Sequence, residues 1–190
     1  MNWTEEGNGW VKDDNGETAL KLNGLGRAFV DFKPFSLKGD DKKNIVDSDG
    51  LTFEIEFMIK DINDRSSVAI DCKSTNGTGF TIKADTATLS SDFGDSLDCK
   101  YSDGVKTKIS FVIEPKKRYD ISTNRFMYIY LNGVLSRVCQ YSPSATFGQG
   151  TDIKTIEIGS SDCTTYVYSL RCYSVSLDHK QILKNYIADI

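Results

Sequence analysis

The sequence is poor in the residues that build many active sites. It contains 1 histidine and 3 prolines among 190 residues, so a metal site made of several histidines is excluded by count alone. The single histidine, His179, lies in a polar segment near the C-terminus, where a solvated surface position is a simpler interpretation than a Ser-His-Asp or Cys-His site. No apolar run approaches the roughly 20 residues that a membrane span needs. We therefore expect no histidine-based catalysis and no membrane insertion.

Charge of one sign is not concentrated anywhere either. The net charge is -4, and the basic residues are scattered apart from Lys116–Arg118. A nucleic-acid partner would need a basic stripe or patch, so we predict no nucleic-acid binding. With 39% hydrophobic and 26% charged residues, the composition is that of an ordinary globular domain. The length fits a single domain, 1–190, that is large enough to bury a hydrophobic core without the help of disulfides or metal ions.

The five cysteines do not form a disulfide framework, because their number is odd and no short spacing repeats. No pair has the C-x-x-C spacing of a zinc site. Cys72, Cys139 and Cys172 lie in apolar strand-like runs, where cysteine behaves as a small buried hydrophobe. We predict free structural thiols and folding in a reducing compartment. Since residues 1–6 lack the regions of a signal peptide, we expect either a cytosolic protein or one domain cut from a longer chain.

Most of the chain reads as short strands separated by turn residues. The expected strands lie within 9–24 (a hairpin turning at Asp14-Asn15-Gly16), 51–61, 66–72, 79–84, 87–91, 97–102, 107–114, 127–138, 153–160 and 165–176. Because no helices intervene, the pattern predicts an all-β fold, a two-sheet antiparallel β-sandwich or jelly roll. We also expect Trp10, at the start of the first strand, to belong to the core.

Two segments carry the clearest local signals. Asn132-Gly133 separates two strand-like runs in 127–138, which predicts a type I′ hairpin that belongs to the scaffold and carries no chemistry. A short C-terminal α-helix is predicted after Asp178, with a capping box to Gln181 and a hydrophobic staple between Leu177 and Ile182. The apolar stripe expected to lie against the sandwich consists of Ile182, Leu183, Tyr186 and Ile187.

The run 51–61 alternates strictly between apolar and mostly polar residues. Its apolar face consists of Leu51, Phe53, Ile55, Phe57 and Ile59. The other face, with Glu54 and Glu56, is expected to be solvated. These two glutamates are separated by roughly 6.5–7 Å along the strand, a spacing that paired carboxylates of glycoside hydrolases use. However, the run lacks the further acids of the E-x-D-x-x-E strand in some jelly-roll glucanases, and we predict no enzyme activity.

Calcium and carbohydrate are the two ligands that the loop residues could bind. Carboxylate-bearing loops at 13–17, 38–44, 46–50 and 91–95 could offer oxygen ligands, but none has the full spacing of a calcium loop. We predict no cofactor, with calcium as the alternative. Sugar binding would use aromatic side chains in loops, beside Asp or Asn groups. Each of these aromatic side chains could equally pack over the edge of the sandwich. The predicted ligand-binding residues are Tyr101, Asp103, Tyr119, Asn124, Tyr141 and Phe147.

The order of motifs resembles a known family. The runs "LTFEIEFMIK", "ISFVIE", "MYIYLNGVL", "IEIGSSD" and "VYSLRCYSVSLDHKQILKNYIAD" are similar, in this order, to laminin-G-like modules of the concanavalin A-like lectin/glucanase superfamily. Within it they most resemble LamG-like domains in structural and tail proteins of tailed bacteriophages and of prophages of gut Firmicutes. The resemblance covers about Gly7 to Asp189. It departs at Tyr168, where many such modules carry an acid.

The resemblance implies a non-catalytic, lectin-like module of a virion or tail protein, with a bacterial surface polysaccharide or glycan and other virion domains as partners. Localisation to a virion made in the bacterial cytoplasm would account for free thiols and for the lack of a signal peptide. The alternatives are a structural spacer that assembles neighbouring domains and, less favoured, a glycan hydrolase, because this fold serves all of these purposes.

Overall fold

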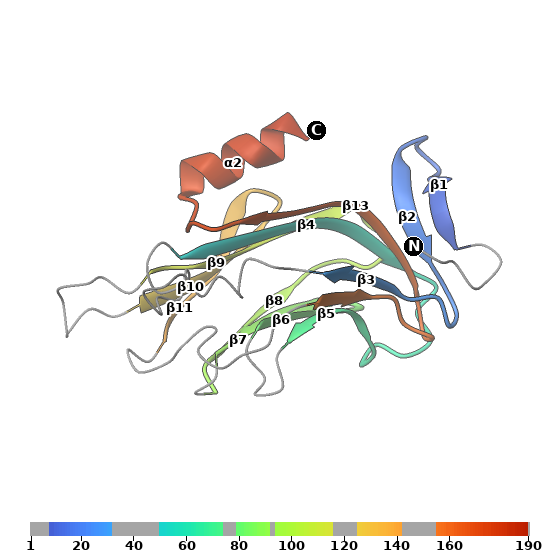
Figure 1. Cartoon of the computed structure of the whole chain (residues 1–190), viewed down its shortest axis with the longest axis horizontal. Coiled ribbons are helices and arrows are strands. Elements are labelled where there is room, and N and C mark those ends of the chain that lie inside the picture. Colours follow the sequence, from blue (N-terminus) through green and yellow to red (C-terminus); the bar gives the residue numbers. More distant parts are fainter. Residues whose placement is uncertain are drawn as a thin grey trace.

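The computed structural model describes residues 8–31, 50–73, 79–91, 94–115, 125–141 and 155–189. It shows two antiparallel sheets packed face to face and one C-terminal helix, which confirms the predicted β-sandwich (Figure 1). Sheet A has seven strands, in the order β1 (Gly9–Lys12), β2 (Thr18–Leu22), β13 (Thr164–Tyr173), β4 (Leu51–Lys60), β9 (Thr107–Ile113), β10 (Arg125–Leu131) and β11 (Val134–Tyr141). Sheet B has six, in the order β3 (Ala28–Asp31), β12 (Thr155–Ile158), β5 (Val68–Lys73), β6 (Gly79–Lys83), β7 (Thr86–Ser90) and β8 (Ser96–Lys100). Helix α2 spans His179–Ala188 and lies over the outer face of sheet A.

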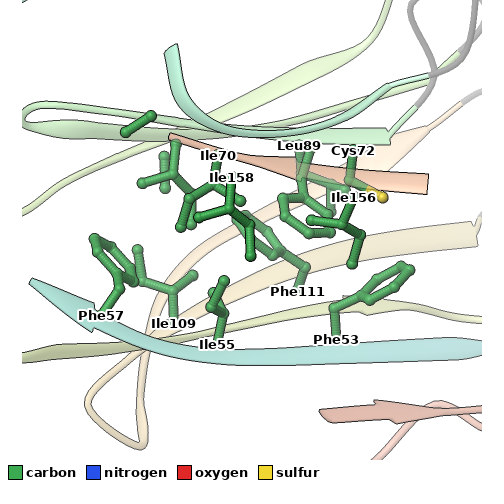
Figure 2. Close-up of a cluster of buried hydrophobic side chains, with 14 of the residues drawn as sticks. Phe53, Ile55, Phe57, Ile70, Cys72, Leu89, Ile109, Phe111, Ile156 and Ile158 are labelled. Atoms are coloured by element: carbon green, nitrogen blue, oxygen red, sulfur yellow. The ribbon is translucent and has the colours of Figure 1, made fainter. Parts of the chain in front are cut away.

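The core lies between the two sheets, where the inward-facing side chains of both interdigitate (Figure 2). Phe80 of sheet B packs against two phenylalanines of sheet A, edge-on to Phe53 at 5.0 Å between ring centroids and stacked on Phe111 at 4.6 Å. Cys72 is completely buried in the same cluster. All five cysteines are free thiols, and burial raises the pKa of Cys72 well above its usual value. The sulfur of Cys72 therefore behaves as part of an apolar core.

The predicted alternation of β4 is half correct. Its apolar face is fully buried, as expected, with Leu51, Phe53, Ile55, Phe57 and Ile59 at most 3% exposed. The other face was expected to be solvated, and this prediction is wrong, because Thr52 and Glu54 are 0% exposed. Helix α2 covers this part of the outer face (Figure 1). A strand pattern cannot reveal that a distant helix lies over its polar side.

The Asn-Gly hairpin is confirmed. Asn132 and Gly133 join β10 to β11 with φ angles of 49° and 76°, the positive values that a type I′ turn requires. A Cβ atom on Gly133 would lie 3.0 Å from the Tyr186 ring of helix α2. The side chain of Asn132 accepts a hydrogen bond from the Lys108 backbone at 2.9 Å. The hairpin is therefore fixed both to its neighbouring strand and to the helix.

Helix α2 begins as predicted but packs through a different face. The capping box is present, with the Asp178 side chain accepting from the Gln181 backbone and the Gln181 side chain accepting from the Asp178 backbone. Leu177 and Ile182 share one buried cluster, as a hydrophobic staple requires. The predicted apolar stripe is wrong: Leu183 and Ile187, which belonged to it, are 36% and 60% exposed. Ile182 is the helix's only buried residue, and polar residues make its other contacts with the sheet.

Trp10 does not belong to the core, contrary to the sequence-based prediction. Its side chain is 64% exposed. Trp10 pairs with Leu20 across the β1–β2 hairpin and so shares the inner face of sheet A with it. Leu20 is only 5% exposed, but β1 is the edge strand of the sheet. The inner face at β1 therefore extends past the packed core.

Candidate functional site

A buried polar network fixes helix α2 to the outer face of sheet A. The Lys108 side chain of β9 is 2% exposed, and its ammonium lies 2.6 Å from Asp189 and 3.7 Å from Glu54. Asp189, at the C-terminal end of α2, also accepts two hydrogen bonds from the Arg171 guanidinium, both at 2.7 Å. This bidentate geometry is the strong form of a carboxylate–arginine contact. Three elements, β9, β13 and α2, are thereby held together.

Glu54 occupies the deepest position of this network. One of its carboxylate oxygens accepts from Tyr173 at 3.2 Å and from Asn185 at 3.1 Å, and the other accepts from Ser110 at 3.3 Å. A buried carboxylate is tolerated only when it is paired and hydrogen-bonded. With Lys108 as counter-ion, Glu54 meets this condition. Its acceptors are used for structure, so it cannot form a catalytic pair with Glu56.

The environment of Asp189 stabilises its charged form. Burial on its own raises the pKa of Asp189, but the hydrogen bonds from Arg171 and Lys108 outweigh it and hold the pKa below the usual 3.8. The carboxylate is therefore ionised whenever the network is intact. Because a carboxylate at a helix C-terminus opposes the macrodipole, the two cations are needed to keep it there.

Beside this network lies a polar pocket of about 140 Å³. Its lining residues come from β4, β9 and the residue before it, the end of α2, the β10–β11 turn and the turn of the β1–β2 hairpin. In Figure 1 this hairpin and α2 stand on the same side of sheet A. The pocket is lined by Glu17, Glu56, Lys106, Lys108, Asn132, Tyr186 and Asp189. We call this set the outer pocket.

Lys106 connects the two sides of the outer pocket. Its ammonium contacts Glu17 at 2.9 Å and Glu56 at 3.3 Å. It also lies 4.8 Å from the centre of the Tyr168 ring, within the range of a cation–π interaction. Tyr168 is the extra residue of a β-bulge in β13, between Val167 and Ser169, which pair with Phe57 and Glu56 of β4. A bulge changes the direction in which the side chain of its extra residue points.

Tyr168, the position at which the sequence departs from the laminin-G-like pattern, has a structural partner. Its hydroxyl donates to the Asp13 carboxylate at 2.9 Å. The other oxygen of Asp13 accepts from the backbones of Asn15 and Glu17 and shapes the β1–β2 turn. In this loop, one of the calcium candidates, the Asp13 carboxylate is therefore engaged in turn formation, while those of Asp14 and Glu17 are paired with Lys60 and Lys106. Among the described residues, no three His, Cys, Asp or Glu side chains gather as metal ligands would.

Asn132 and Tyr186, whose side chains carry hydrogen-bond donors, also line the outer pocket. Asn132 uses its amide oxygen to accept a hydrogen bond from the Lys108 backbone. The carboxylates of Glu17 and Glu56 accept from Lys106 and keep further lone pairs. The pocket thus presents donors and acceptors side by side, the arrangement that binds a hydroxyl group, which is both at once.

Two of the predicted ligand-binding residues are described with their side chains, and they lie outside the outer pocket. Tyr101 packs edge-on against Phe57 at 5.2 Å between ring centroids, and its hydroxyl donates to the Lys83 carbonyl. Burial raises the pKa of Tyr101. Asp103 is paired with Arg65 at 2.9 Å. Both residues thus have structural partners, and a ligand role for either stays a prediction.

The other predicted residues cannot be placed beside these two. Tyr119, Asn124 and Phe147 lie outside the described residues, and Tyr141 is described only as the last backbone position of β11. The calcium-candidate segments 38–44 and 46–49 also lie outside the described residues, as do positions 92 and 93 of the segment 91–95. Their roles stay predictions.

Sequence reasoning missed the outer pocket because its residues are scattered along the chain. Glu17 follows a turn, Asn132 is a hairpin residue, and Tyr186 was assigned to an apolar stripe. Glu56 had been considered as a member of an acidic pair, and Glu17 as part of the calcium-candidate loop 13–17. The one available signal was the polar set Asn185 and Asp189, four residues apart on one face of α2.

Comparisons with known proteins support the fold. No protein-family model matches the chain, and no curated protein matches it. Among solved structures it is similar to the receptor-binding domain of a botulinum neurotoxin C/D mosaic serotype, with a TM-score of 0.67 and 15% identity over 99% of this chain and 45% of that one. It is also similar to the binding domain of botulinum neurotoxin DC in complex with SialylT, with a TM-score of 0.63 and 14% identity over 98% and 45% of the two chains. For the receptor-binding domain of botulinum neurotoxin type G, the TM-score is 0.62 and the identity 12%, over 98% and 46%.

These likenesses show the two-sheet β-sandwich fold and no more, because the identities are low. The chain spans less than half the length of each of these solved chains. What they bind is a property of the whole domains. The finer resemblance to LamG-like domains of tailed phages is not supported by a family match and stays a prediction.

Proposed function

We propose that this chain is a non-catalytic carbohydrate-binding module. The observation that carries the proposal is the outer pocket, whose lining residues include Asn132, Tyr186, Glu17 and Glu56, with side chains that can donate or accept hydrogen bonds. Its volume of about 140 Å³ is well below the roughly 300–1,000 Å³ of pockets for drug-sized ligands. It suits one sugar ring at the end of a glycan rather than an oligosaccharide. The fold shared with receptor-binding domains, one of them in complex with SialylT, is consistent with this proposal.

A binding role also fits the chemistry of the neighbouring carboxylates better than catalysis does. A glycoside hydrolase needs two carboxyl groups free to act on either side of the scissile bond. Glu54 is enclosed, and Glu56 is paired with Lys106. The order of sequence motifs supports the finer proposal, in which the module belongs to a virion or tail protein made in a bacterial cytoplasm and recognises bacterial surface polysaccharide.

The proposal is tested by probing an array of bacterial surface polysaccharides, with and without calcium. The variant Glu17→Trp places a large side chain at the mouth of the pocket, where Glu17 is 45% exposed. Its matched control is Glu157→Trp on the outer face of sheet B, where the glutamate is 49% exposed. We expect Glu17→Trp to weaken binding at least about tenfold and the control to retain it. No binding by the unaltered chain to any glycan would refute the proposal.

One further observation favours a second role as a spacer or assembly module. The edge strand β11 exposes Val134, Leu135 and Val138, at 63%, 44% and 50%. An exposed apolar edge strand is a surface on which another chain or domain can pair. If this edge contacts a neighbouring virion domain, Val138→Lys should impair assembly of the full-length protein and leave glycan binding unchanged. Normal assembly of this variant would count against the second role.

A further inference from the structure

The charges of the outer pocket indicate which sugars it accepts, provided that the proposed carbohydrate-binding function is correct. The lining contains three carboxylates, Glu17, Glu56 and Asp189, but only two ammonium groups, Lys106 and Lys108. Including Glu54 and Arg171, which pair with Lys108 and Asp189 of this lining, adds one charge of each sign and leaves the excess unchanged. The site is therefore rich in charge and yet slightly negative.

Neither lysine is available to neutralise an anionic ligand. Lys108 is 2% exposed and is held by Asp189, Glu54 and the Asn185 carbonyl, the last at 3.1 Å. Lys106 is held by both oxygens of Glu17 at 2.9 Å. To turn Lys108 toward a ligand would strip a buried carboxylate of its counter-ion, which is costly. Lys106 is 27% exposed, and an anionic ligand would have to compete for it with Glu17 and Glu56.

The groups that remain for a ligand are neutral donors and partly used acceptors. The Asn132 amide and the Tyr186 hydroxyl can donate, and the lone pairs of Glu17 and Glu56 can accept. A pair of neighbouring sugar hydroxyls satisfies both kinds of group without bringing a charge into the pocket. A sugar carboxylate would instead face the like charges of Glu17 and Glu56 at close range, and among the described lining residues both cations are already paired.

From these contacts we infer that the outer pocket selects an uncharged pyranose and rejects sugars that carry a carboxylate. The inference separates this chain from a receptor for sialylated or uronic-acid glycans. The inference also predicts that the selectivity arises from carboxylates of the protein. Substituting one of these carboxylates should therefore change the selectivity while Asn132 and Tyr186 stay as they are.

The test compares two probes that differ in one group, methyl glucoside and methyl glucuronide. Their dissociation constants are measured by ligand-observed NMR titration with the full chain. We expect the glucoside to bind at least about tenfold more tightly. Glu56→Gln, which removes one charge and keeps the shape, should narrow this ratio by about fivefold. Asp98→Asn, the same change on the outer face of sheet B, should leave the ratio unchanged. Thermal unfolding of each variant verifies that it is folded.

The remaining outcomes are distinguishable. Equal or tighter binding of the glucuronide would overturn the inference while leaving carbohydrate binding intact. A preference for the glucoside that Glu56→Gln does not change would also overturn it, because the selectivity would then arise outside the outer pocket. Failure of both probes and of every glycan on the array would instead refute the proposed function itself.

Discussion

The substitution Asp189→Asn tests the network that holds helix α2 on the sheet. Asn has nearly the same shape as Asp and keeps one acceptor for Arg171, but it removes the charge that faces Lys108 at 2.6 Å. Lys108 is 2% exposed, so it would be left in the interior with only Glu54, at 3.7 Å, as a counter-ion. A buried charge that loses its best partner is the most costly result of such a change.

The magnitude follows from burial. Removing one partner of a buried ion pair costs about 3–5 kcal/mol. The Asp189 and Arg171 side chains are 14% and 39% exposed, which places this site at the lower end of that range. Removing a carboxylate from a helix C-terminus returns about 0.3–1 kcal/mol. We therefore expect a net loss of about 2 kcal/mol in the free energy of unfolding, which lowers Tm by about 4–8 °C in a domain of this size.

The assay is urea denaturation of the two proteins at several pH values, with Asp98→Asn as the control. Because the folded pKa of Asp189 lies below the usual 3.8, its contribution is complete above that pH and is lost as the pH falls through the folded pKa. The difference between wild type and variant should thus be largest near neutral pH and disappear in stronger acid. A difference below about 0.5 kcal/mol near pH 7, or one that persists unchanged in acid, would refute the network as a source of stability.

Three further predictions concern single sites. Gly133→Val should lower the free energy of unfolding by at least about 2 kcal/mol, because it combines a positive φ with a clash against Tyr186. In urea denaturation this loss should exceed that of Gly104→Val, where φ is 70° and nothing lies within 4 Å. Equal losses for the two variants would contradict the clash. Asp178→Ala should cost about 1 kcal/mol by removing the capping box, and an unchanged Tm would contradict that role. Burial raises the pKa of Asp71, whose Oδ1 is buried without a hydrogen bond. The folded state therefore favours the protonated carboxyl, and the stability that this form contributes is lost as pH rises through the folded pKa. Asp71→Asn should therefore stabilise the protein by about 0.5 kcal/mol near neutral pH and not below pH 3 or so; destabilisation at both pH values would show that the carboxylate has a partner.

Local signals in the sequence were sufficient for the scaffold. Strict alternation identified the inner face of β4, Asn132-Gly133 identified the hairpin, and Asp178 with Gln181 identified the start of the helix. Each depends on residues close together in the chain, where propensity and side-chain direction act directly. The strand β3 was missed because Ala28, Phe29 and Val30 are apolar on both faces of the strand, so that no alternation marks it.

The outer pocket could not be predicted, because it depends on contacts between residues far apart in sequence. Lys106 and Glu17 are separated by 89 positions, and Asn185 and Glu54 by 131. Polar residues on one face of a strand and on one face of a helix each read as solvated when considered alone. Only their mutual burial converts them into a network, and that burial is a property of the tertiary arrangement.

The most direct test of the proposed site is a titration of methyl glucoside into the isotope-labelled chain, followed by the backbone amide shifts. Ligand in the outer pocket should shift amides around Glu17, Lys106, Asn132 and Asp189, which come from four separate segments and meet only there. Residues on the outer face of sheet B should not move. Shifts confined to that face, or no shifts at a saturating concentration of the sugar, would contradict the outer pocket as a carbohydrate site.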